Sequence, residues 1–219
     1  MQDARGNTTT YGYDSTDTFV TSVTRPTTSN GVAHVLKTEY DPSTGLVTRT
    51  DDENSVAHGQ AYSTYYSYFQ SGSSIGRLQQ VQTYGGGLTT YSYPNPNEVD
   101  TSVLQAGSTS LTTATIVDSR GRPYKKVSGD TYTETTYDGD GRAYCVTNPQ
   151  SSSGYSSTDG GVCTYYDGAD RPISKSMQDG NSMTMPYSGN TVTVTDEVGH
   201  KKEYASDAFG QLTDVWEPD

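Results

Sequence analysis

The chain of 219 residues has few basic side chains and no long apolar run. It carries 14 lysine and arginine residues against 26 acidic ones, which gives a net charge of −12. Nucleic-acid binding depends on neutralising phosphates, so this charge argues against nucleic-acid partners. No apolar run approaches the roughly 20 residues that a membrane-spanning helix needs, so we expect no membrane insertion. The polar start, Met1–Gly6, is no signal peptide and begins within a repeat motif. We therefore interpret the chain as a piece of a longer protein.

Aliphatic side chains are also scarce, since only 30% of the residues are hydrophobic and 18% are charged. Such a composition can indicate disorder. Here the polar residues are largely threonine and serine, and 19 residues are tyrosine. Threonine and tyrosine favour pleated, half-buried surfaces. The composition therefore predicts a broad, thin β-sheet rather than a disordered chain.

Residues that could form a reactive centre show no suitable spacing. The three histidines, His34, His58 and His200, lie far apart and are expected on exposed strands or turns. A metal site needs three or four convergent ligands, and no Gly-x-Ser-x-Gly elbow is present. The acidic run Asp51–Glu53 is predicted to be a solvated turn. We predict no catalytic residue, no metal site, no cofactor and no enzymatic activity.

The only two cysteines, Cys145 and Cys163, flank an insertion at about residues 146–162. Between Asn148 and Gly161 this insertion is rich in serine, glycine, asparagine and proline, which is typical of a loop. A disulfide would close the loop and would suit an oxidising compartment. The alternative is two unpaired cysteines, each on a strand.

Internal repeats of the form (Tyr)-Asp-x-x-Gly-Arg are the strongest pattern present. The clearest copies are Tyr137–Ala143 and Tyr166–Pro172, and Tyr40–Leu46 has one additional turn residue. Asp118 and Asp138 begin copies 20 residues apart, a period that suits one β-hairpin per unit. Asp favours the first position of a type I turn, and Gly accepts its strained position. The residues assigned to the motif are Tyr40, Asp41, Gly45, Asp118, Gly121, Arg122, Tyr137, Asp138, Gly141, Arg142, Tyr166, Asp167, Arg171, Asp207 and Gly210.

The tyrosines of the motif have two possible roles. Repeated between neighbouring hairpins, they would pack ring on ring in ladders that fix the strand register. Exposed rows of tyrosine could instead stack on sugar rings. Between the turns, residues alternate with period two, as in Thr191–Thr195, which is the pattern of strands. No window shows sustained helical spacing.

These motifs resemble those of the Rhs family, also called YD-repeat proteins, over nearly the whole chain. The resemblance rests on Tyr137–Ala143, Tyr166–Pro172, Asp3–Asp14 and Tyr187–Asp196. It implies an all-β fold in which tandem hairpins form one long, curved, spiralling antiparallel sheet, as a segment of an open shell or solenoid. We expect eight to ten hairpins in a single repeat array over residues 1–219.

The resemblance also implies a function. Bacterial members resemble secreted toxins whose shells enclose a C-terminal cargo, and the animal teneurins are adhesion molecules. The self-cleaving core segment of the toxin shells has no counterpart here, so autoproteolysis and toxicity are not carried over. We expect a non-catalytic shell segment that is secreted or at the cell surface, with neighbouring repeats and an enclosed cargo as partners. The alternatives are an adhesion or carbohydrate-binding module and an extracellular filament subunit. Exposed sheet edges would favour edge-to-edge self-association.

Overall fold

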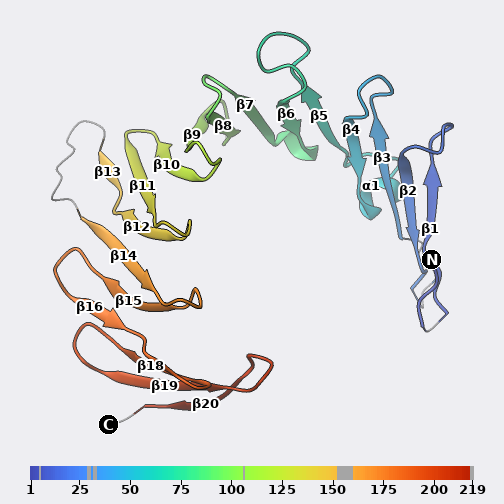
Figure 1. The fold of residues 1–219 in the computed structure, drawn as a ribbon. Coiled ribbons are helices and arrows are strands. Elements are labelled where there is room, and N and C mark those ends of the chain that lie inside the picture. Colours follow the sequence, from blue (N-terminus) through green and yellow to red (C-terminus); the bar gives the residue numbers. More distant parts are fainter. Residues whose placement is uncertain (5, 29–30, 32–33, 106, 152–159, 218–219) are drawn as a thin grey trace. The chain divides into compact units, whose positions relative to one another are not determined.

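The structure, a computed structural model, describes residues 1–4, 6–28, 31, 34–105, 107–151 and 160–217. It is almost entirely β (Figure 1). The strands are β1 (Thr10–Tyr13), β2 (Val20–Arg25), β3 (His34–Tyr40), β4 (Val47–Asp51), β5 (Thr64–Tyr68), β6 (Leu78–Gln82), β7 (Leu88–Ser92), β8 (Glu98–Leu104), β9 (Ser110–Val117), β10 (Pro123–Ser128), β11 (Thr131–Tyr137), β12 (Ala143–Thr147), β13 (Gln150–Ser151), β14 (Gly161–Tyr166), β15 (Pro172–Ser176), β16 (Ser182–Thr184), β17 (Tyr187–Ser188), β18 (Thr191–Thr195), β19 (Lys201–Ser206) and β20 (Leu212–Trp216). Two short helical segments interrupt them, α1 (Glu53–Ala57) and the 3-10 turn η1 (Tyr84–Gly86).

The twenty strands found among the described residues belong to one open sheet, and every pairing between them is antiparallel. The predicted all-β architecture is therefore confirmed. The chain divides into two compact units, Met1–Thr112 and Thr113–Asp219, which are described separately. The insertion predicted at about residues 146–162 includes residues 152–159, which lie outside the described part of the chain.

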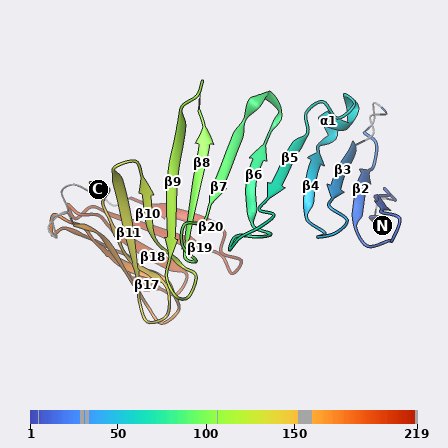
Figure 2. The same ribbon diagram turned by 90° about the horizontal axis from the view of Figure 1, so that it is seen from above.

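In the first unit the strands β1 to β8 follow one another in chain order. Each pairs with the next through a hairpin or a short connection (Figure 2). In the second unit β10 to β20 are built in a similar way, except that β12 pairs with β14 and the short β13 pairs with β11. There β16 and β17 both pair with β18, so that together they form one interrupted strand opposite it. Consecutive turns in each unit therefore alternate between the two ends of the strands. The Tyr-Asp turns recur at one end only.

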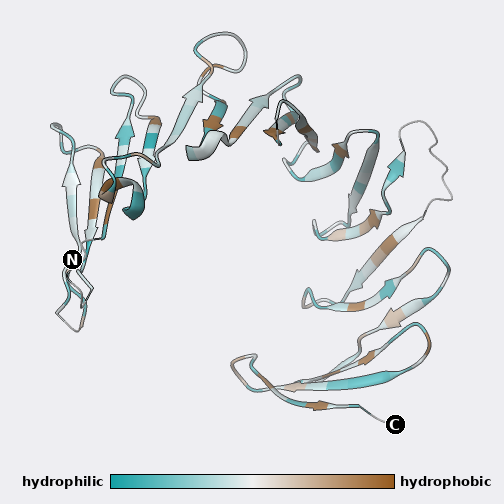
Figure 3. Cartoon of the chain, turned by 180° about the vertical axis from the view of Figure 1, so that it is seen from behind, coloured by the Kyte–Doolittle hydropathy of each residue, from teal (hydrophilic) through white to brown (hydrophobic). Residues whose placement is uncertain are grey.

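The sheet has almost no apolar interior. Among the described residues, Met185 and Ala205 are the only buried hydrophobic ones. Apolar and polar positions alternate along the strands instead of gathering into one core (Figure 3). Cross-strand pairs, which contribute roughly 0.2–1 kcal/mol each, must therefore carry much of the stability. This agrees with the thin sheet that the composition predicted.

The prediction of a solvated turn at Asp51–Glu53 was wrong. Asp51 is only 2% exposed, at the end of β4, and its carboxylate accepts a hydrogen bond of 3.0 Å from the Ser55 hydroxyl. The Ser63 hydroxyl donates to the same oxygen, and Arg49 Nε donates to the other at 3.1 Å. Asp52 begins α1 as its N-cap, accepting from the Ser55 backbone N–H. A buried charge needs partners, and the polar side chains around the helix supply them.

The prediction that all three histidines are exposed was wrong for one of them. His34 is half-buried, and its Nδ1 lies 2.6 Å from a carboxylate oxygen of Glu53. His200 is exposed, and it lies in a turn as predicted. No helix among the described residues is long and apolar enough to cross a membrane.

Candidate functional site

The turn Asp138–Arg142 shows how one copy of the motif works. The Asp138 backbone N–H donates to the Arg142 carbonyl at 2.9 Å, and the Gly141 N–H donates to the Asp138 carbonyl at 3.1 Å. The Asp138 side chain is a second acceptor inside the turn. Its Oδ1 accepts from the backbone N–H groups of Asp140 and Arg142 at 3.0 and 2.9 Å, and its Oδ2 accepts from Arg142 Nε at 2.7 Å. The aspartate thus satisfies turn donors that no strand partner could reach.

The same pattern recurs at the other copies of the motif. At Asp118 the N–H groups of Arg120 and Arg122 donate to the carboxylate at 2.8 and 2.9 Å. Corresponding bonds from backbone N–H groups to Oδ1 occur at Asp14, Asp41, Asp167, Asp196 and Asp207. The sequence motif is therefore a hydrogen-bonded turn in both units.

The fourth position of the turn has a left-handed backbone. Gly121 and Gly141 have φ angles of 77° and 90° there, which glycine adopts without steric cost. In the copy that begins at Asp167, Asp170 takes this position with a φ of 62°. Asp tolerates the left-handed region better than most residues do, so this copy keeps its turn without a glycine at the fourth position.

The arginine that follows connects one turn to the next. The Arg142 guanidinium pairs with Asp138, and its Nη1 also donates to the Asp167 carbonyl at 3.1 Å and to Asp170 at 2.8 Å. Its Cζ lies 4.9 Å from the ring centre of Tyr166. Similar contacts place Arg122 over Tyr137, Arg171 over Tyr187 and Arg77 over Tyr93 at 4.1, 4.3 and 4.9 Å. These are cation–π distances, and they join consecutive hairpins.

The tyrosine hydroxyl makes a second connection. In five cases it donates to a backbone carbonyl on the neighbouring strand. The acceptor is the first residue after the preceding turn at the same end of the strands. We call these five residues the tyrosine ladder. The bonds are Tyr40 to Val20 at 3.1 Å, Tyr68 to Val47 at 2.9 Å, Tyr93 to Leu78 at 3.0 Å, Tyr137 to Pro123 at 2.6 Å and Tyr166 to Ala143 at 2.9 Å. Each bond spans two strands, so it ties one hairpin to the next.

The ladder differs from the ring-on-ring packing that the sequence suggested. Among the described residues, no ring contact joins two ladder tyrosines. Phe19 stacks on Tyr40 with centroids 4.8 Å apart, in the place that arginine takes elsewhere. Phe69 meets Tyr93 edge to face at 6.0 Å. An arginine or phenylalanine of the preceding turn thus lies against most of these rings.

Two members of the ladder, Tyr68 and Tyr93, escaped sequence reasoning. Neither tyrosine is followed by the aspartate of the motif, so they were not among the residues assigned to it. The available signal was the tyrosine itself, which stands directly before a turn; Tyr68 lies 28 residues after Tyr40, and Tyr93 lies 25 residues after Tyr68. In the last turn, Asp207–Gln211, glutamine replaces the arginine, so this copy has the turn without the cation.

Three of the turn aspartates have lowered pKa values. Hydrogen bonds from the Arg122 backbone and side chain lower the pKa of Asp118. The Arg171 side chain and backbone N–H likewise lower the pKa of Asp167. At Asp138 burial raises the pKa, but hydrogen bonds from Arg142 outweigh it and the net shift is downward. Carboxyl groups with lowered pKa values and fixed partners are poor proton donors at neutral pH.

Cys145 and Cys163 are directly opposite each other on β12 and β14, with Cα atoms 4.0 Å apart. Their sulfur atoms are bonded at 2.07 Å. The bond joins the two strands on either side of the insertion.

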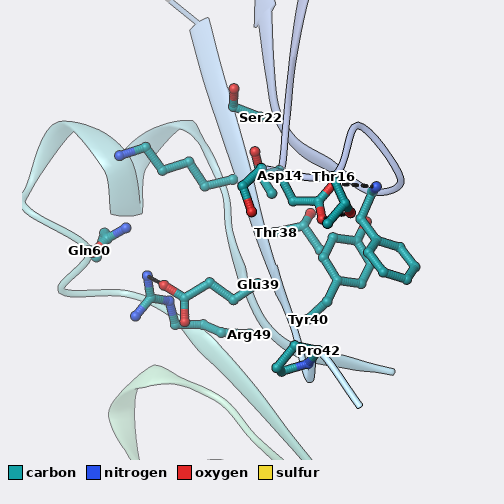
Figure 4. A pocket seen from close by; sticks show the side chains of 13 residues that line it. Asp14, Thr16, Ser22, Thr38, Glu39, Tyr40, Pro42, Arg49 and Gln60 are labelled. Carbon is teal, nitrogen blue, oxygen red and sulfur yellow. Dashed lines mark hydrogen bonds and ion pairs between the residues drawn. The ribbon is translucent and has the colours of Figure 1, made fainter. Parts of the chain in front are cut away.

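A cavity of about 650 Å³ opens on the first unit beside β2, β3 and β4 (Figure 4). Glu39 pairs with Arg49 at 2.5 Å, and Arg49 also pairs with Asp51. These ion pairs connect β3 to β4. Within the part of the chain that the structure describes, no group of three or more histidine, cysteine or acidic side chains could hold a metal ion.

The fold resembles that of toxin-complex proteins with solved structures. The crystal structure of TcdB2-TccC3 matches 94% of this chain and 14% of that chain, with a TM-score of 0.59 and 12% identity. The crystal structure of TcdB2-TccC3-Cdc42 matches 97% of this chain and 13% of that chain, with a TM-score of 0.53 and 14% identity. The likeness at this identity is one of fold.

This chain therefore spans about one-seventh of the length of those chains. No model of a protein family matches the sequence. A search of curated proteins likewise found no match.

Proposed function

We propose that the chain is a structural, non-catalytic segment of an Rhs-type β-shell that encloses a cargo or toxin domain, in a protein secreted by a bacterium or displayed on its surface. The tyrosine ladder is the observation that carries this proposal. Its hydroxyl bonds, together with the arginine contacts, join each hairpin to the next. A repeat array gains stability from such neighbour-to-neighbour contacts, and a wall requires them.

The charged groups of the motif support the absence of catalysis. Asp118, Asp138 and Asp167 each accept several hydrogen bonds within their own turns. They are fully used in holding the backbone. The negative net charge and the thin polar sheet also suit a soluble wall better than a nucleic-acid or membrane partner.

The shell proposal can be tested on the longer parent chain by limited proteolysis. An enclosed downstream domain should resist a protease that digests the same domain rapidly when it is expressed alone. Arg142→Met should loosen the wall and raise the cleavage rate of that domain. Arg120→Met is the matched control, because the Arg120 side chain makes no ion pair among the described residues. Equal cleavage of the attached and the isolated domain would contradict the proposal.

A second candidate function, carbohydrate binding, is favoured by one observation. Tyr144 and Tyr165 meet edge to face with centroids 5.4 Å apart, and Tyr165 is 41% exposed on the second unit. Exposed aromatic rings can stack on sugars. A glycan array would test this function. Binding that Tyr165→Ala abolishes and Tyr137→Phe preserves would support it, whereas an array without reproducible binding would exclude it.

A further inference from the structure

The Cys145–Cys163 disulfide crosses a strand pairing in the second unit that no tight turn closes. β12 and β14 lie side by side with three residue pairs in register (Figure 1). We call this pairing the insertion seam, because the insertion joins the two strands in sequence. By contrast, turns at residues 138–142, 167–171 and 196–200 close the hairpins β11–β12, β14–β15 and β18–β19. The insertion seam therefore depends on other contacts to stay closed.

Small polar side chains flank the disulfide on the strands to either side. Thr136 on β11 is directly opposite Cys145, and Ser176 on β15 is directly opposite Cys163. Residues directly opposite each other share one face of a sheet, so these four residues form a row across four strands. Both cysteines are partly exposed to solvent. A small thiol can therefore reach the bond from this face without unfolding the unit.

Contacts at the turn end anchor the insertion seam independently of the disulfide. The Tyr166 hydroxyl donates to the Ala143 carbonyl at 2.9 Å, and Arg142 donates to Asp170 at 2.8 Å. Both bonds lie at the end of the strands where the Tyr-Asp turns recur. They keep β12 and β14 together at this end when the disulfide is reduced.

The insertion end of the seam depends more strongly on the disulfide. There the Asn148 backbone N–H donates to the Gly160 carbonyl at 3.1 Å, and the Asn148 side chain donates to Gln178. A neutral hydrogen bond changes an opening equilibrium about fivefold. The disulfide closes a loop with a sequence separation of 18, and in the loop-entropy model it contributes a factor on the order of a hundred. It is therefore the largest single contribution to the closure of this end.

Opening of the insertion seam would affect the whole unit, because contacts in a repeat array run between neighbours. β10 to β13 lie on one side of the seam, and β14 to β20 lie on the other. Separation of β12 from β14 would expose the N–H and C=O groups of two strand edges within the sheet. The state of the disulfide thus controls the continuity of the sheet at this place.

We propose that the Cys145–Cys163 disulfide is a redox-controlled latch. It holds the insertion seam closed when oxidised, and the seam opens from the insertion end when a dithiol reduces the bond. A thiolate of the dithiol attacks one sulfur, forms a mixed disulfide and releases the other cysteine, which takes up a proton. The second thiol of the reductant then displaces the remaining cysteine. The protein gains two electrons and two protons as two thiols, and the dithiol becomes a disulfide.

The latch responds to the compartment that surrounds the protein. Disulfides persist in oxidising surroundings outside cells, whereas the thiol systems of a cytosol keep cysteines reduced. One consequence rests on the shell function proposed above. In such a shell, the latch would keep the wall closed outside cells and open it in a reducing compartment.

Native-state hydrogen exchange of the chain of 219 residues tests the latch, with dithiothreitol as the dithiol. Iodoacetamide labelling of a parallel sample confirms that both thiols have formed. Peptides that cover Cys145–Thr147 and Gly161–Cys163 should then exchange up to about a hundredfold faster. Peptides that cover Thr191–Thr195 and Lys201–Ser206 are the internal control. Because a tight turn closes that hairpin, its exchange should stay unchanged.

Three results would overturn the proposal. The first is a disulfide that dithiothreitol does not reduce without denaturant. The second is unchanged exchange at the insertion seam after reduction. The third is equal acceleration in β18 and β19, which would indicate a general loss of stability rather than a latch. The measurement needs no enclosed domain, so its failure concerns the latch alone, and the proteolysis test above concerns the shell alone.

A variant without the bond and a reversal complete the test. Cys145→Ser combined with Cys163→Ser should exchange rapidly at the insertion seam with and without dithiothreitol, and slow exchange in this variant would overturn the latch. Ser176→Ala is the matched control and should keep the response to the dithiol. Reoxidation of the wild-type chain does not depend on the folding of the double variant. It should restore slow exchange at the seam, and a permanent loss of protection would refute a reversible latch.

Discussion

The ladder bond made by Tyr68 allows a sharp test, because its own strand supplies the control. Replacing Tyr68 by Phe removes the hydroxyl that donates to the Val47 carbonyl at 2.9 Å and leaves the ring in place. Burial raises the pKa of Tyr68, so this hydroxyl is partly withdrawn from water. A neutral hydrogen bond contributes about 1 kcal/mol net to stability. We therefore expect β4 and β5 to open about fivefold more often.

Native-state hydrogen exchange measures this locally. Peptides that cover Val47–Asp51 and Thr64–Tyr68 should exchange about fivefold faster in Tyr68→Phe, in line with a hydrogen bond of about 1 kcal/mol. Tyr65→Phe, on the same strand, is the matched control, because Tyr65 is 50% exposed and its hydroxyl has no partner among the described residues. If both variants change the exchange rates equally, the ladder bond contributes nothing and the reasoning fails.

Three further predictions concern the turns and the disulfide. Gly141→Ala should destabilise the second unit by about 1–2 kcal/mol, because the backbone φ of Gly141 is 90°. Gly139→Ala should not destabilise it, because Gly139 has no positive φ. Thermal unfolding compares the two variants. The pKa of Asp14 is lowered to about 2 by hydrogen bonds from the Thr16 side chain and from backbone N–H groups. The ionised Asp14 carboxylate therefore stabilises the folded state fully above the unfolded pKa of 3.8, and this stabilisation is lost as the pH falls towards 2. An Asp14→Asn variant should show a flatter acid transition by circular dichroism. Reducing the Cys145–Cys163 bond should lower stability by about 3 kcal/mol, measured by denaturant titration with and without reductant.

Clear outcomes would contradict each of these predictions. Equal melting temperatures for the two alanine variants would show that the left-handed position carries no strain. An unchanged acid transition in Asp14→Asn would assign the acid sensitivity to other carboxyl groups. Identical denaturation curves in both redox states would mean that the bond does not restrict the unfolded chain.

The sequence by itself determined the local elements. In the turn Asp138–Arg142, all donors and acceptors lie within five residues, so the order of residue types was sufficient to predict the turn. The same holds for the alternating strands and for the all-β class. The short helix α1 was missed because five residues are too few to show a helical period.

Only the tertiary structure decided the contacts between hairpins. Tyr68 and its acceptor Val47 are 21 residues apart, and any carbonyl suits a hydroxyl donor. The partner therefore follows from the strand register and not from the identity of the acceptor residue. The burial of Asp51 has the same origin, since α1 and the residues after it fold back over the end of β4. Sequence motifs specify bonds that close within a turn, whereas bonds across strands depend on where the sheet places each backbone group.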